Sequence, residues 1–279
     1  MNTRILASLM VIGLVASAIG MGTYAYFSDT ETSTGNTFTA GSIDLKIDNH
    51  CWYNGVECYC ESPGTCCWDE NGDKKCDAKE ETCTCTWELT DLSNELFFNF
   101  KDLKPGDWGE DTVSLHVYNN DAWACVYLEG WTDKDNTCVD PEIEAEGENN
   151  CAPDNEGELA ENLEFAFWWD EDGDNVYEPD DGEWLFGDIN TVEGLYDDSP
   201  LTIVDSVYRG WPLKGSTTYH IGKVWCFGKL SWDDTNKEWI CDGSGIDNKP
   251  QTDKVTATIT FVAEQYRNNE NFKCSDLQT

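Results

Sequence analysis

The chain has 279 residues, with 55 Asp and Glu against 17 Lys and Arg, so its formal net charge at pH 7 is -38. A surface of this charge repels nucleic-acid phosphates and anionic lipid headgroups, which excludes both as partners, and it attracts cations. The 13 Trp, 11 Tyr and 11 Phe argue against a disordered chain, because each aromatic side chain buries a large apolar area.

Residues 1–25 have the pattern of a signal peptide. Arg4 supplies a positive charge, residues 5–24 are uncharged and mostly apolar or small, and Ala25 ends the small-residue pattern of a cleavage site. We therefore expect cleavage after Ala25 and a secreted protein, extracellular or at the cell surface. The alternative is a retained membrane anchor, since a membrane span needs about 20 apolar residues. Apart from this segment, no contact with a membrane is expected.

Alternating apolar residues predict short strands after the signal. The first run is Ile43, Leu45 and Ile47, so residues 26–48 are assigned to an extended N-terminal segment and a first strand. Similar runs follow at Val113-Leu115-Val117, Leu163-Phe165-Phe167-Trp169 and Val255-Ala257-Ile259-Phe261. Short strands separated by turn-forming residues predict an all-β chain, folded as a jelly-roll-like antiparallel β-sandwich.

A cystine-rich insertion is expected at residues 49–88. Eight of the 14 Cys lie between Cys51 and Cys85, where apolar periodicity is almost absent, so disulfides rather than a core must hold this segment. We expect these eight to pair chiefly with one another. The alternative is thiolate zinc binding at Cys58/Cys60, Cys66-Cys67 or Cys83/Cys85. The other six are expected to cross-link loops and strands: Cys125, Cys138, Cys151, Cys226, Cys241 and Cys274.

Residues 89–279 are expected to form the remainder of the sandwich, with an acidic insertion at about residues 136–207. Between Asp140 and Asp198 the chain has 22 Asp and Glu and no Lys, Arg or His. Such a charge density expands a segment unless cations screen it.

Residues 170–183 in the acidic region predict a calcium site. Asp170, Asp172 and Asp174 alternate along the loop, which is the spacing by which a tight loop wraps a hard cation. Val176 can offer its carbonyl, and Glu178 with Asp181 or Glu183 can complete the ligand set. The alternative is a solvated acidic loop.

A second calcium-type loop is predicted at residues 69–80. Oxygen ligands occupy its positions 1, 3, 5, 9 and 12. Position 6, where the sharp turn favours Gly, is Lys74, and the alternative is a polar turn between cystines. The five candidate ligands are Asp69, Asn71, Asp73, Asp77 and Glu80.

Catalytic residues are not evident. His50, His116 and His220 are far apart in the sequence, and no His-Glu-x-x-His pair, Gly-x-Ser-x-Gly elbow, P-loop or dinucleotide motif is present. We therefore expect no catalytic site. A calcium-dependent adhesin or carbohydrate-binding module stays open as an alternative, because exposed Trp side chains can stack on sugars.

Five stretches, in chain order, resemble the TasA/camelysin family of secreted proteins. They correspond to that family's signal junction, first strand, central turn, next strand and closing strand. The stretches are residues 22–29 (GTYAYFSD), 38–45 (FTAGSIDL), 103–107 (LKPGD), 113–120 (VSLHVYNN) and 255–265 (VTATITFVAEQ).

The resemblance implies a jelly-roll-like domain, exported through a dedicated signal peptidase and built into extracellular fibres of a biofilm matrix or of related archaeal filaments. Subunits of such fibres join by donor-strand complementation, so the implied partners are copies of the same chain and possible matrix proteins. Residues 26–37 lack Pro and can extend to donate a strand to a vacant edge. Some camelysins are described as metallopeptidases, and a camelysin-like peptidase is therefore the enzyme alternative.

Overall fold

The computed structural model describes residues 28–32, 43–76, 80–93, 95–147 and 156–277. The expected signal peptide at residues 1–25 lies outside these ranges, as do residues 26–27 and 33–42 of the N-terminal segment. Within the described ranges, no helix has the length and apolar character needed to cross a membrane.

The larger sheet has nine strands. They are β2 (Asp44–Tyr53), β3 (Val56–Ser62), β4 (Thr65–Trp68), β5 (Trp87–Thr90), β6 (Trp108–Tyr118), β8 (Leu163–Asp170), β9 (Trp184–Leu185), β10 (Asn190–Thr191) and β12 (Thr217–Phe227). Their order is β10-β8-β12-β6-β2-β3-β4, with β5 beside β2 and β9 beside β8. All of these pairings are antiparallel.

The smaller sheet has four antiparallel strands. From one edge to the other they are β1 (Ser28–Thr32), β15 (Lys254–Gln265), β7 (Ala122–Lys134) and β11 (Leu201–Val204). A separate hairpin consists of β13 (Lys229–Asp233) and β14 (Glu238–Asp242). Helices are short: α2 (Asp140–Glu146), α3 (Val192–Asp197) and the 3-10 turns η1 (Ala160–Asn162), η2 (Pro179–Asp181) and η3 (Cys274–Asp276).

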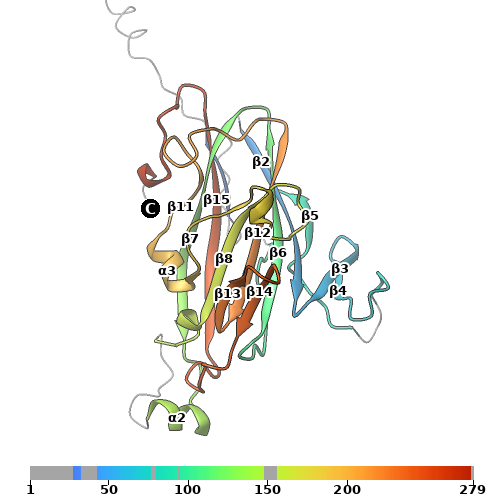
Figure 1. Ribbon diagram of the computed structural model, residues 1–279, viewed down its shortest axis with the longest axis vertical. Helices are drawn as coiled ribbons and strands as arrows, with labels where there is room; N and C mark the ends of the chain where they lie inside the picture. The colour runs from blue at the N-terminus through green and yellow to red at the C-terminus, as the bar shows by residue number, and fades with distance from the viewer. Residues whose placement is uncertain (1–27, 33–42, 77–79, 94, 148–155, 278–279) are drawn as a thin grey trace, which may run out of the picture.

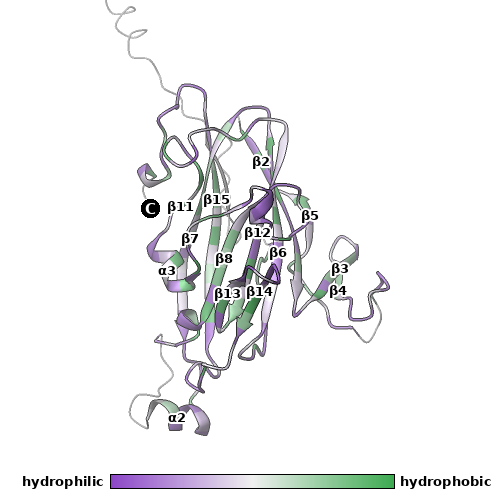
Figure 2. Ribbon diagram, in the orientation of Figure 1, coloured by the Kyte–Doolittle hydropathy of each residue, from purple (hydrophilic) through white to green (hydrophobic). Residues whose placement is uncertain are grey.

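One hydrophobic core is shared by the two sheets. Leu45 and Leu115 from the larger sheet, and Trp123 and Phe261 from the smaller one, belong to the same cluster of buried side chains. Hydrophobic residues gather along the strands and hydrophilic residues along the loops (Figure 2). The four predicted strands are present as β2, β6, β8 and β15. The prediction of an all-β, antiparallel chain is confirmed, while its jelly-roll-like connectivity stays a prediction.

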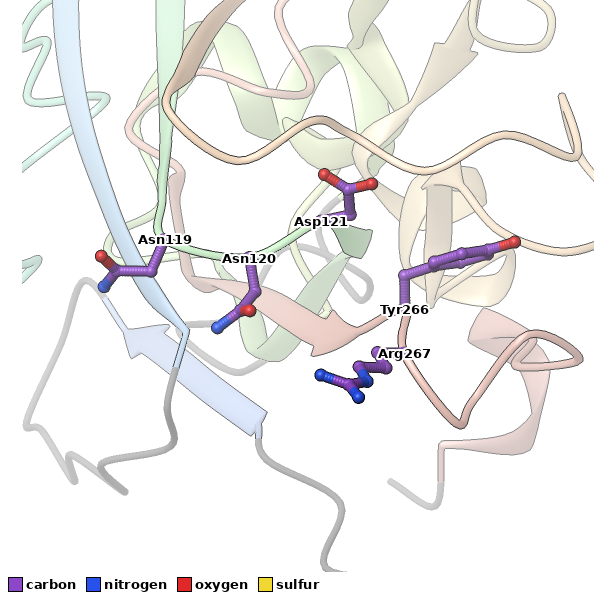
Figure 3. A pocket seen from close by; sticks show the side chains of 5 residues that line it. All are labelled: Asn119, Asn120, Asp121, Tyr266 and Arg267. Carbon is purple, nitrogen blue, oxygen red and sulfur yellow. The ribbon is translucent and has the colours of Figure 1, made fainter.

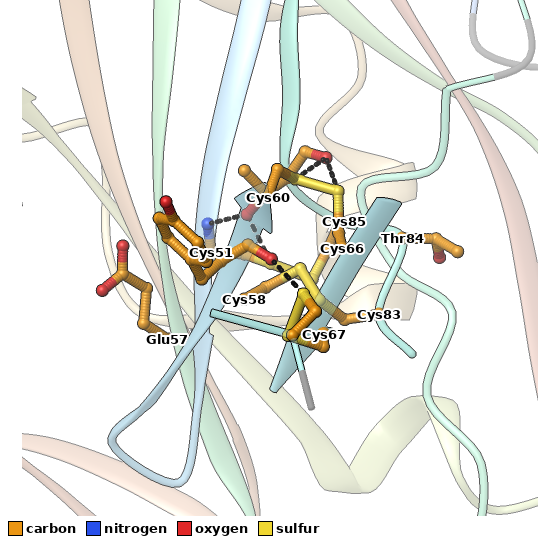
Figure 4. The surroundings of a disulfide bond; sticks show 12 residues. Cys51, Glu57, Cys58, Cys60, Cys66, Cys67, Cys83, Thr84 and Cys85 are labelled. Atoms are coloured by element: carbon orange, nitrogen blue, oxygen red, sulfur yellow. Dashed lines mark hydrogen bonds between the residues drawn. A yellow bond between two sulfur atoms is a disulfide. The ribbon is translucent and has the colours of Figure 1, made fainter. Parts of the chain in front are cut away.

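The cystine-rich segment extends one end of the larger sheet. Its hairpin of β3 and β4 projects sideways from the sheets in Figure 1, and the disulfides around it are drawn in Figure 4. The eight Cys pair only with one another, as predicted: Cys51–Cys85, Cys58–Cys83, Cys60–Cys66 and Cys67–Cys76. Because all eight thiols are used in disulfides, the zinc alternative has no free thiolate in this segment.

The acidic region does not stand apart from the sheets. Residues 136–207 include β8, which pairs with β12 in the larger sheet, and β11, which pairs with β7 in the smaller one. The region expected to interrupt the sandwich therefore supplies strands to both sheets. Within the described ranges, further disulfides join Cys125 to Cys274, 149 positions apart, and Cys226 to Cys241, 15 positions apart.

A buried ion pair links the middle strands of the larger sheet. Nζ of Lys223 on β12 lies 3.2 Å from Oδ2 of Asp111 on β6, and the two residues are 3% and 0% exposed. Asn49 of β2 donates from Nδ2 to Oδ1 of Asp111 at 3.1 Å, and Nζ of Lys223 lies 3.9 Å from the ring centre of Phe98. Burial raises the pKa of Asp111 and lowers that of Lys223, and each charge partly offsets this effect on the other.

Removing one member of this pair should destabilise the fold more than removing both. Asp111→Ala leaves the Lys223 charge buried without a counterion, which is expected to lower the free energy of unfolding by about 3–5 kcal/mol. Adding Lys223→Met to Asp111→Ala should restore part of that loss. Guanidinium unfolding measures both variants, and Lys104→Met, in the exposed pair with Asp102, is the control without measurable effect. A double variant less stable than Asp111→Ala would contradict the coupling.

Candidate metal centre

The loop at residues 171–183 is closed by paired strands at its base. Asp170 is the last residue of β8, and β9 pairs back on β8 with Trp184 opposite Trp169. The rings of these two Trp are stacked, with centroids 5.3 Å apart and an angle of 9° between their planes. The aromatic stack and the strand pairing fix the two ends of the acidic loop relative to the sheet.

The first three predicted ligands lie together. Ligand oxygens of Asp170, Asp172 and Asp174 are all within 4.8 Å of one another. Two oxygens on a single calcium ion lie at most about 5 Å apart, because calcium–oxygen distances are about 2.3–2.6 Å. The three carboxylates therefore have the spacing of ligands to one calcium ion.

Asp170 fixes the turn that carries the other two carboxylates. It is 1% exposed, and its Oδ1 and Oδ2 accept the backbone N–H groups of Gly173 at 2.7 Å and Asn175 at 3.0 Å. Asn175 has φ 65°, a left-handed conformation that Asn tolerates better than most residues. Asn175 thus makes the sharp turn at position 6 that calcium loops usually assign to Gly.

The remaining predicted ligands differ in how far they are exposed to solvent. The side chain of Val176 is exposed and Asp181 is exposed in η2, whereas Glu178 is half-buried. Partial desolvation, followed by the charges of Asp174 and Asp181, raises the pKa of Glu178, so its carboxylate lies near the group. A loop with so many like charges gains stability from a divalent cation.

Glu183 closes the loop through the backbone. It is 7% exposed, and its Oε1 and Oε2 accept the N–H groups of Glu171 and Glu178, both at 2.8 Å. Desolvation and the nearby charge of Asp170 raise the pKa of Glu183. Glu183 therefore braces the loop at two points, and it lies close enough to Asp170 to feel its charge.

Aromatic packing attaches the other side of the loop to the β13–β14 hairpin. The ring of Tyr177 lies 4.9 Å from that of Trp232 and 5.7 Å from that of Trp239. An exposed ion pair of 3.0 Å joins Lys237 of the same hairpin to Asp180. Apolar contacts thus hold the part of the loop around Tyr177. The carboxylates of Asp170, Asp172 and Asp174 form a separate group.

The loop at residues 69–80 repeats the backbone of the first one. Its first six residues are DENGDK, against DEDGDN in the loop that begins at Asp170. Asp69 is 6% exposed and accepts the N–H groups of Asp73 at 3.1 Å and Lys74 at 3.0 Å. Gly72 and Lys74 have φ 72° and 59°, matching Gly173 and Asn175 at the same loop positions. The sharp turn is therefore made even though Lys74 occupies position 6.

The two loops differ in their charge. Lys74 forms an ion pair with Glu57 on β3, beside the loop, and Asn71 replaces the second Asp of the other loop. Asp77 lies outside the described residues, and Glu80 is half-buried next to the disulfide of Cys67. The structure brings Asp69, Asn71 and Asp73 together through the N–H group of Asp73. Fewer carboxylates converge in this loop than at Asp170.

The histidines lie on one face of the larger sheet and contact polar neighbours. None of them belongs to a group of three metal-ligand side chains within the part of the chain that the structure describes. The nearest partners are Glu57 for His50 (Nε2–Oε1 2.9 Å), Asp48 for His116 (Nε2–Oδ2 2.6 Å) and Ser114 for His220 (Nδ1–Oγ 3.2 Å).

A shallow polar hollow lies where β15 ends (Figure 3). It is lined by Asn119, Asn120, Asp121, Tyr266 and Arg267. Asp121 is engaged by Lys214, whose Nζ lies 2.8 Å from its Oδ2, and by the N–H group of Gly215 at 3.0 Å. The residues that line the hollow do not pair a nucleophilic side chain with a general base.

Removing two carboxylates from the first loop should abolish one calcium site. Asp172→Asn with Asp174→Asn should lose one bound calcium per chain, because these exposed side chains converge with Asp170. In the unaltered protein this ion should raise the free energy of unfolding by about 2.7 kcal/mol at a hundredfold excess over Kd. Titration calorimetry and thermal melts in calcium or chelator measure both effects.

The matched control is Glu193→Gln with Asp197→Asn, two exposed acids on α3 that make the same change in charge. It should bind calcium as the unaltered protein does. Unchanged binding by the double variant at Asp172 and Asp174 would contradict the site and direct attention to residues 69–80.

A known protein family matches the first part of the chain. The sequence model of the family described as camelysin metallo-endopeptidase matches residues 2–55, which end just after β2. No curated protein matches the chain. The family match and the disulfides together indicate an extracellular protein. The predicted resemblance to the TasA/camelysin family is confirmed over residues 2–55, and this part of the chain carries the camelysin family pattern.

Proposed function

We propose that the protein is an exported structural subunit of extracellular filaments or matrix, which polymerises by exchange of its N-terminal strand. Three features support this function: the camelysin family match at residues 2–55, the dense disulfides of a protein built for oxidising surroundings, and an N-terminal strand at a sheet edge. The strand at the edge is the observation that carries the proposal.

β1 occupies the outer edge of the smaller sheet. It pairs antiparallel with β15, from Ser28 opposite Glu264 to Thr32 opposite Thr260. The other edge of β15 is already paired with β7. A strand at an edge has one neighbour only, so it can leave without breaking the rest of the sheet. This position suits a strand that exchanges between subunits.

In the single chain, the edge of β15 is filled by the chain's own β1. The sequence led us to expect a vacant edge that receives the N-terminal segment of another subunit. An identical strand from a second subunit can take the same register and make the same backbone hydrogen bonds. The free-energy change of the exchange is therefore small, and a high subunit concentration favours it. When each subunit gives its strand to one neighbour and receives a strand from another, the contact is head-to-tail and propagates into a filament instead of closing as a swapped dimer.

Calcium and disulfides would serve this role by stabilising the subunit. A chain with a formal charge of -38 repels its own copies, and bound divalent cations lower that repulsion. Disulfides hold the segments that lack apolar residues. The acidic loops and the cystine-rich segment would thus keep the subunit folded outside the cell.

The family's description as a metallo-endopeptidase favours a second candidate, a secreted peptidase. A catalytic zinc commonly has His among three protein ligands. The three histidines contact separate polar partners, and within the described residues none joins two other metal-ligand side chains. We therefore favour the structural role.

Preventing β1 from pairing should abolish polymerisation without unfolding the subunit. Deleting residues 26–37 should leave a soluble, folded monomer. Asp29→Pro with Thr30→Pro should act similarly, because successive N–H groups of an edge strand point to opposite sides, so one of the two substitutions removes a ladder hydrogen bond to β15. Negative-stain microscopy and size-exclusion chromatography measure assembly, and circular dichroism checks the fold. A synthetic peptide covering residues 26–37 should bind the deletion variant.

Thr30→Val keeps a strand-forming residue at the same position and is the matched control. It should assemble as the unaltered protein does. Ordinary filaments from the deletion variant would contradict strand exchange, and lateral packing through calcium would then explain assembly better.

A test for peptidase activity separates the two candidates. The purified protein should not increase casein hydrolysis above background, with or without added zinc, because its histidines do not share a metal site. Turnover that copurifies with the protein and disappears in chelator would support the peptidase.

A further inference from the structure

A second group of carboxylates lies at the end of the molecule that carries α2 (Figure 1). Ligand oxygens of Asp135, Glu142 and Asp253 are all within 4.8 Å of one another. These residues come from the segment after β7, from α2 and from the loop before β15. None of them belongs to either of the two predicted calcium loops.

Asp133 on β7 adds a fourth carboxylate to this group. A Cβ on Gly157 would lie 2.7 Å from Oδ1 of Asp133 and 3.0 Å from Oδ2 of Asp253, so these two carboxylates are close neighbours beside Gly157. Oδ2 of Asp133 accepts the N–H group of Ala160 at 2.6 Å. Oδ1 of Asp133 is shielded from solvent and accepts no hydrogen bond from the described residues.

Burial makes this arrangement costly for the bare carboxylates. Asp133, Asp135 and Glu142 are 5%, 6% and 0% exposed, and ionised acids are almost never buried this far without a counterion. Desolvation and the charges of the other three raise the pKa of Asp253 to about 7. The group therefore concentrates negative charge where Asp135 and Glu142 are buried and Asp253 is half-buried.

Among the described residues, neither Asp133 nor Asp253 forms an ion pair with a basic side chain. The chain has no Lys, Arg or His from Asp135 to Tyr208. Lys134 and Lys254 are next to Asp133 and Asp253 in sequence, but both are exposed, and successive residues of a strand point to opposite faces. A cation from solution can balance the negative charge of the group.

The carboxylates are held as preformed ligands. Asp253 uses Oδ2 to accept the N–H groups of Glu158 at 2.7 Å and Leu159 at 3.1 Å, while its Oδ1 is shielded and accepts none from the described residues. Glu142 likewise uses Oε2 to accept the N–H group of Val139 at 3.3 Å. Each backbone bond fixes one oxygen of a carboxylate, so the side chain is held in place by the protein itself.

We propose that Asp133, Asp135, Glu142 and Asp253 bind one calcium ion, which ties α2 and the end of β7 to the start of β15. An all-oxygen set of several carboxylates suits calcium, whereas zinc prefers His and Cys ligands and magnesium keeps several waters. β8 separates this site from the loop at Asp170, and its eight residues put the two sites about 25 Å apart. The two ions therefore bind independently.

The test uses Glu142→Gln, which removes one buried charge with little change in shape. Equilibrium dialysis of the purified protein should show one bound calcium fewer per chain than in the unaltered protein. Combined with Asp172→Asn and Asp174→Asn, it should remove two. Glu144→Gln on the same helix is exposed and should bind calcium normally. Equal calcium binding by Glu142→Gln and the unaltered protein would overturn the site.

Hydrogen exchange gives a readout that does not depend on a variant folding. In the unaltered protein, calcium should slow exchange in residues 131–146 at least tenfold relative to chelator, and the variant at Asp172 and Asp174 should keep this effect. In chelator, Glu142→Gln should melt no lower than the unaltered protein, because it relieves repulsion among the carboxylates. Equal exchange of residues 131–146 in calcium and in chelator would overturn the proposal.

Discussion

Carboxylates that accept backbone N–H groups organise the loops of this protein. Asp170 and Glu183 close one acidic loop in this way, and Asp205 accepts the N–H groups of Val207, Tyr208 and Cys274. With 17 basic residues for 55 acidic ones, few carboxylates can pair with a side chain of opposite charge. N–H groups satisfy the hydrogen bonds but carry no net charge, so a group of several carboxylates keeps its negative charge and is suited to bind a cation.

The features that the sequence predicts well are local ones. Alternation at Ile43, Leu45 and Ile47 has a period of two residues, which only a strand with one buried face produces, and these residues are buried in β2. The cystine segment was also predictable, because eight Cys in a stretch without apolar periodicity have mainly one another as partners. The loop at Asp170 was found because its candidate ligands follow one another within a few residues.

Features that depend on distant parts of the chain could not be predicted in this way. The carboxylates of Asp135, Glu142 and Asp253 meet because β7 and β15 pair, and no short motif in the sequence marks them. Lys223 occupies a position of β12 that faces the core, which a pattern of apolar residues cannot explain without knowledge of Asp111. The pairing of β1 with β15 joins the two ends of the chain.

The disulfide Cys125–Cys274 also changes what happens when the chain is cut. It joins residues 149 positions apart, and the acidic region lies between them. A protease that cleaves any exposed loop between these two cysteines therefore leaves two pieces that stay covalently attached. Paired strands on both sides of the cut, such as β7 with β15, hold the pieces in register. A nicked molecule of this kind keeps its shape until a reductant reaches the bond.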